Sequence, residues 1–125
     1  MPESLLAHYQ PSFTCHQGCG VEWMIIKPHI IEFVWEDEET SATTLTAYCP
    51  IQTSEELSEN LNHGKGRYRI TCDSRGEKPE TATAESILLS RFTIRMVFQD
   101  RLSIIDDPQG QISRIYQKSE AGKVN

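Results

Sequence analysis

A two-residue alternation of apolar and polar side chains runs through most of this chain and constrains its fold more than any other feature. The alternation is clearest in residues 92–98, where Phe92, Ile94, Met96 and Phe98 share one face. Such a pattern is typical of a strand with one buried face. On this basis, together with enrichment in β-branched and aromatic residues, we expect strands at residues 21–26, 30–35, 43–49, 67–72, 92–98, 101–105 and 111–117.

Two short helices are expected between these strands. Thr53 and Glu56 match a capping box, and Gly64 stands where a C-terminal cap is favoured. Residues 80–89 suit a second short helix, and residues 3–9 suit a single helical turn. Pro50 is expected to end the strand that precedes the first helix, because proline cannot donate to a sheet ladder.

Short connections between the strands favour antiparallel pairing, since parallel strands need long crossovers. The sequence therefore predicts an α+β fold, with a mainly antiparallel curved sheet or small open barrel of about six to seven strands and one or two short helices. Its 125 residues are the usual size of one domain. A single domain over residues 1–125 is predicted, with a loose polar tail from about residue 118.

The charge balance narrows the classes of partner. The chain has 12 lysines and arginines against 18 aspartates and glutamates, a formal net charge of -6. This balance disfavours non-specific binding to duplex nucleic acid or to an anionic membrane. No apolar run reaches the roughly 20 residues that span a bilayer, and the start of the chain lacks a secretory signal pattern. A soluble, cytoplasmic protein is the expectation.

The four cysteines offer one possible metal site. Cys15, Cys19, Cys49 and Cys72 could in principle form a four-thiolate zinc site, although only the first two are close in the sequence. Alternation turns Cys49 and Cys72 toward the interior, where free cysteine behaves as a small apolar residue. Reduced core thiols without a cofactor are therefore expected, while zinc binding and disulfides remain alternatives.

The most basic stretch of the chain suggests a binding surface. A two-residue period places Lys65, Arg67 and Arg69 on one face, and Arg91 and Arg95 would extend this stripe if their strand lies alongside. Arginine presents a rigid fork of donors that suits carboxylate or phosphate. These five residues are the predicted binding residues, and a second candidate surface is the acidic turn at residues 36–39.

No catalytic signature or phosphate-binding loop is present, so the leading hypothesis is a non-enzymatic protein that binds a macromolecular partner, most simply another protein, through a sheet face or edge. Pairing with a second copy of the chain also remains open. One alternative is a small-ligand-binding domain with an aromatic-lined interior, and another is a zinc-supported or thiol-dependent enzyme. The possible lining residues of the ligand-binding alternative are Trp23, Phe33, Trp35, Phe92 and Met96.

Overall fold

Antiparallel strands make up most of the described structure. The computed structural model describes residues 6–11, 20–37, 39–57, 67–98, 101–105 and 115–118. These residues form strands and no helix. The strands are β1 (Ala7–Pro11), β2 (Gly20–Ile26), β3 (Ile30–Asp37), β4 (Thr43–Leu57), β5 (Arg67–Cys72), β6 (Ile87–Leu88), β7 (Arg91–Phe98), β8 (Arg101–Ile105) and β9 (Ile115–Lys118).

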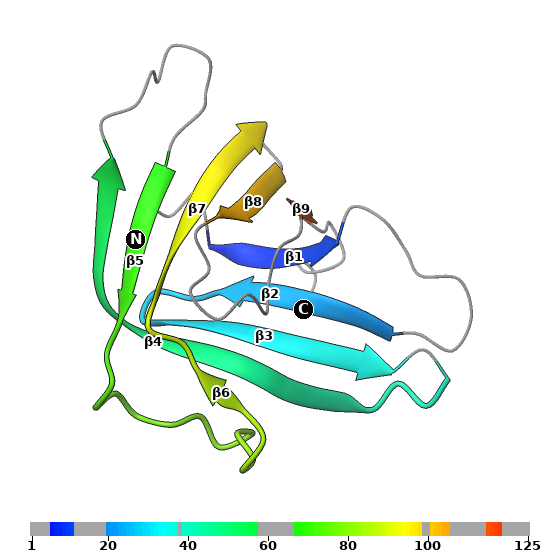
Figure 1. Cartoon of the computed structure of the whole chain (residues 1–125). Coiled ribbons are helices and arrows are strands. Elements are labelled where there is room, and N and C mark those ends of the chain that lie inside the picture. The colour runs from blue at the N-terminus through cyan, green and yellow to red at the C-terminus, as the bar shows by residue number, and fades with distance from the viewer. Residues whose placement is uncertain are drawn as a thin grey trace.

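Eight of these strands follow one another around a nearly closed barrel (Figure 1). Each pairs antiparallel with the next, in the circular order β1-β2-β3-β4-β5-β7-β8-β9, and β9 pairs with β1 to complete the ring. The short strand β6 pairs in parallel with β4 outside this ring. Closing a sheet in this way leaves few unpaired backbone groups at its edges.

The long strand β4 belongs to both sides of the barrel. Its first half, from Thr43 to Pro50, pairs with β3, and its second half, from Ile51 to Leu57, pairs with β5. In Figure 1, β4 runs along β3 at the base of the barrel and then turns upward beside β5. The predicted strand end at Pro50 is therefore wrong, because proline here marks a bend within a continuous strand.

Several contacts hold the chain at this bend. A disulfide joins Cys49 to Cys72, whose Cα atoms lie 5.0 Å apart. The Asp73 amide donates a hydrogen bond of 2.6 Å to the Pro50 carbonyl oxygen. Gly76 packs so closely against the Pro50 ring that a Cβ atom at this position would overlap it. The bend therefore depends on a covalent link, a backbone hydrogen bond and a residue without a side chain.

Large apolar side chains fill the middle of the barrel. Met24, Ile31 and Phe33 are fully buried on the inner face of β2 and β3. The Phe33 ring lies edge-on to Phe92 with 6.1 Å between centroids, and 6.4 Å from the ring of Tyr116. Phe33 thus connects opposite sides of the barrel. The inward direction predicted from the alternation in residues 92–98 is confirmed for Phe92 and Ile94.

The α+β fold class is wrong, because the described residues contain no helix. Residues 53–57 complete β4 and pair with β5, so their backbone groups are satisfied by a neighbouring strand and not by a helical turn. Residues 80–86 form turns before β6, and residues 7–11 form β1 in place of a helical turn. In residues 53–57 and 7–11, hydrogen bonding to a neighbouring strand outweighs the local preference for a helix. Gly64 and the tail beyond residue 118 lie outside the described residues.

Candidate functional site

Strand pairing brings the predicted basic residues together. β5 and β7 are neighbours, with Arg67 opposite Arg95, Arg69 opposite Thr93 and Thr71 opposite Arg91. The two strands therefore lie side by side, as the extended stripe required, while binding by these residues stays a prediction. Lys65, the remaining member of the predicted set, lies outside the described residues.

The arginines of β5 and β7 point away from the interior of the barrel. Residues that alternate with them face the core: Ile70, Phe92 and Ile94 are at most 2% exposed. Because successive side chains of a strand lie on opposite faces, the arginines lie on the outer face. Arg69 and Arg91 are exposed, whereas Arg67 and Arg95 are half-buried.

A fifth arginine joins this face from the next strand. β8 pairs with β7, placing Ser103 opposite Arg95, and Leu102 of β8 is buried. Arg101 therefore lies on the outer face, where it is exposed. The sequence reasoning missed it, although its alternation with Leu102 carried the signal. We call the outer surface formed by Arg67, Arg69, Arg91, Arg95 and Arg101 the arginine face.

The arginine face is strongly positive on an acidic protein. Glu55, opposite Arg69 on β4, is the one acidic residue paired with it in the described ladders. Five arginines thus share one face of a chain whose formal net charge is -6. Within the described residues, Arg69, Arg91 and Arg95 make no ion pair.

The predicted cysteine residues separate into two groups. Cys49 and Cys72 are buried at 0% and 7% exposure, which confirms that they face the core. They form a disulfide, so the expected reduced state is wrong for this pair. Cys15 and Cys19 lie outside the described residues. Zinc binding by four thiolates stays a prediction, and it would require the disulfide to be reduced first.

No metal site is apparent elsewhere in the part of the chain that the structure describes. It contains no group of three or more histidine, cysteine, aspartate or glutamate side chains placed to hold a metal ion.

The aromatic residues suggested as a ligand-binding lining do not gather around one space. Phe33 and Phe92 contact each other inside the barrel. Trp35 shares the face of Phe33 and is half-buried, but Trp23 alternates with the fully buried Met24 and so lies on the outer face. The structure does not describe the side chain of Met96.

The acidic turn after β3 has a structural role. One carboxylate oxygen of Asp37 accepts hydrogen bonds from the Glu39 and Thr40 amides, at 2.9 and 3.1 Å. These backbone donors lower the pKa of Asp37 below its ordinary value, because they stabilise the charged form. Ser41 adopts a positive φ of 59° in the same turn. The Asp37 carboxylate thus organises the connection to β4, and Glu38 lies outside the described residues.

Comparisons with known proteins identify no relative. Searches of protein families, of curated protein sequences and of solved structures found no match to this chain. In the described residues there is also no helix long and apolar enough to cross a membrane.

Proposed function

We propose that this protein is a non-enzymatic binding domain whose arginine face captures an acidic segment of another protein. The observation that carries the proposal is the register of β5 and β7, which sets Arg67 directly opposite Arg95. Side chains opposite each other in an antiparallel pair have Cβ atoms about 5 Å apart. A carboxylate bound between two such guanidinium groups could accept charge-assisted hydrogen bonds from both.

The spacing of the arginines suits an extended peptide. Arg67 and Arg69 lie two positions apart on one strand, a distance of roughly 7 Å. Alternate side chains of an extended acidic segment have the same spacing, so successive carboxylates could meet successive arginines. Each guanidinium can bind a carboxylate through two parallel hydrogen bonds, which adds geometric selectivity to the charge attraction.

The residues beside the arginines on β5 and β7 favour a protein partner over nucleic acid. Single-strand binders stack bases on aromatic side chains that stand beside their basic residues. In the described parts of β5 and β7, the residues that alternate with the core-facing ones, other than arginine, are Thr71 and Thr93, and Thr93 is only 5% exposed. The aromatic residues Tyr68 and Phe92 lie on the inner face. Duplex binding is disfavoured by the net charge of -6.

The test compares two charge-reversed proteins of equal net charge. Arg67→Glu/Arg69→Glu alters the arginine face, and Arg75→Glu/Lys78→Glu makes the same change at exposed positions of the loop after β5. The probe is a fluorescent peptide with alternating glutamate and serine, and binding is followed by anisotropy at low and high salt. We expect the first variant to lose binding and the control to keep it, with wild-type binding weakened by added salt.

Three results would overturn the proposal. One is equal binding of the peptide by wild type and by the Arg67→Glu/Arg69→Glu protein. Another is an equal loss of binding in both variants, which would show that binding depends on the net charge of the protein and not on the arginine face. The third is stronger binding of an oligothymidine than of the peptide. Circular dichroism and thermal unfolding of each variant establish that the fold is retained.

The disulfide bears on where such binding occurs. Disulfides persist mainly in oxidising compartments, so the Cys49–Cys72 bond favours such a compartment over the cytoplasm that the sequence predicted. The compartment in which the protein acts and its pairing with a second copy of the chain both stay predictions.

A further inference from the structure

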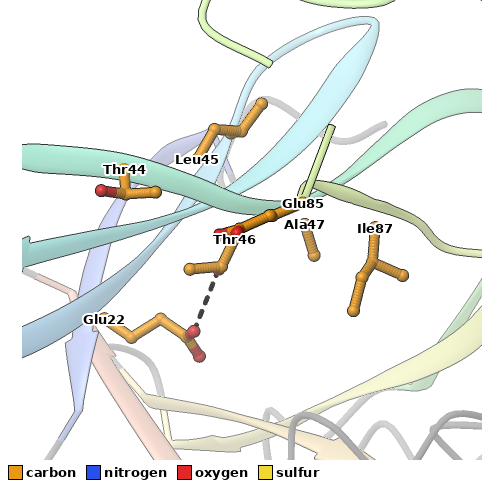
Figure 2. A pocket seen from close by; sticks show the side chains of 7 residues that line it. All are labelled: Glu22, Thr44, Leu45, Thr46, Ala47, Glu85 and Ile87. Atoms are coloured by element: carbon orange, nitrogen blue, oxygen red, sulfur yellow. Dashed lines mark hydrogen bonds between the residues drawn. The ribbon is translucent and has the colours of Figure 1, made fainter. Parts of the chain in front are cut away.

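A small cavity with an acidic wall lies away from the arginine face. Its volume is about 200 Å³. It is bordered by β2, by the first half of β4 and by the segment that leads into β6. The lining residues are Glu22, Thr44, Leu45, Thr46, Ala47, Glu85 and Ile87. Figure 2 shows Glu22 directed at Thr46, with Ala47 and Ile87 beside the same space.

Glu22 is an acid on the inner face of the barrel. It alternates with Met24 and Ile26, which are 0% and 2% exposed, so it belongs to the same inward row of β2. One carboxylate oxygen lies 3.1 Å from the Thr46 hydroxyl, which is also 2.9 Å from the Phe33 carbonyl oxygen. The other oxygen accepts a hydrogen bond of 3.4 Å from the Tyr116 hydroxyl. The single Thr46 hydroxyl proton is thus shared between the Glu22 carboxylate and the Phe33 carbonyl oxygen, and the Tyr116 hydroxyl is the second neutral group at the carboxylate.

The cavity wall carries negative charge without a compensating cation. Among the lining residues, Glu22 and Glu85 are acidic and none is basic. No ion pair to Glu22 occurs within the described ranges. Contacts with neutral hydroxyl groups orient the half-buried Glu22 carboxylate but leave its charge unbalanced, so it would attract a cation that enters the cavity.

Besides the two glutamates, the wall consists of two threonines and three apolar residues, and the apolar residues would contact the body of a ligand. Leu45 and Ala47 are each 3% exposed, and Ile87 is half-buried. A protein cavity of about 150 Å³ accommodates benzene. We propose that the cavity binds a small primary amine with a single ring or a short alkyl body, with its ammonium group on Glu22 and its apolar part against Ala47 and Ile87. This site is independent of the arginine face.

The experiment separates charge from shape. Benzylamine and benzyl alcohol have nearly the same size, and only the amine is a cation at neutral pH. Each is titrated into wild type, into Glu22→Gln and into Glu55→Gln, the last removing a carboxylate on the arginine face as a control. Affinities are measured by calorimetry.

Wild type and Glu55→Gln should bind benzylamine about tenfold more tightly than benzyl alcohol, because the ammonium forms a charge-assisted hydrogen bond. Glu22→Gln should lose this preference. Equal affinities of the two compounds for wild type, no binding of benzylamine at millimolar concentration, or an unchanged preference in Glu22→Gln would each overturn the proposal.

A measurement on the wild-type protein covers the case in which Glu22→Gln does not fold. Addition of benzylamine should shift the amide resonances of Thr46, Ala47 and Ile87 in nuclear magnetic resonance spectra. Shifts confined to other parts of the chain would refute the site.

Discussion

Removal of the Cys49–Cys72 disulfide should destabilise the barrel strongly. The bond links β4 to the end of β5 at the bend around Pro50, across a sequence separation of 23 residues. A cross-link stabilises the folded state mainly by restricting the unfolded chain, and the effect increases with the length of the closed loop. For a loop of this length the chain-entropy relation gives about 3.4 kcal/mol at 25 °C.

This magnitude is a large part of the 5–15 kcal/mol by which domains are ordinarily stable. The measurement is urea unfolding of Cys49→Ala/Cys72→Ala, compared with wild type in the oxidised and the reduced state. With a urea dependence of about 1–3 kcal/mol per molar, the unfolding midpoint should decrease by about 1–3 M. Reduced wild type should unfold near the variant, since both lack the link.

Two further measurements make the result decisive. Peptide mapping without reductant should recover Cys49 linked to Cys72, and Cys15→Ser/Cys19→Ser should keep the oxidised midpoint because it retains the link. Recovery of Cys49 and Cys72 as free thiols, or an oxidised and a fully reduced wild type with the same midpoint, would refute the reasoning.

Two other predictions concern packing and pH. Gly76→Ala should lower the free energy of unfolding by about 1–3 kcal/mol, because its methyl group would overlap the Pro50 ring. Ser74→Ala in the same turn is the control, and an equal effect of the two substitutions would contradict this explanation. Burial raises the pKa of Tyr9 from its ordinary 10.0 to about 12. Between these two values the folded state retains the phenol proton that the unfolded state loses. The contribution of Tyr9 to the free energy of unfolding is therefore fully present below about pH 10 and is lost as the pH rises to about 12. Tyr9→Phe should flatten this part of a chemical-unfolding profile, and an unchanged slope would count against it.

Several features of the candidate sites followed from the sequence and others did not. The outward direction of Arg67 and Arg69 was predicted, because each alternates with residues that face the core. Arg101 was missed, as was the inward position of Glu22, although both follow from the same two-residue period. The cavity beside Glu22 also needs β4 and the segment leading into β6, which no local pattern brings together.

The sequence by itself determined which segments alternate and which side chains face inward, because successive residues of a strand always lie on opposite faces. The tertiary structure decided which strands are neighbours, including the pairing that sets Arg67 opposite Arg95. It also decided that residues 53–57 form a strand and not a helix, because β5 supplies their hydrogen-bond partners. Pairing joins residues far apart in the chain, so it depends on closure of the whole barrel and not on the preference of any one segment.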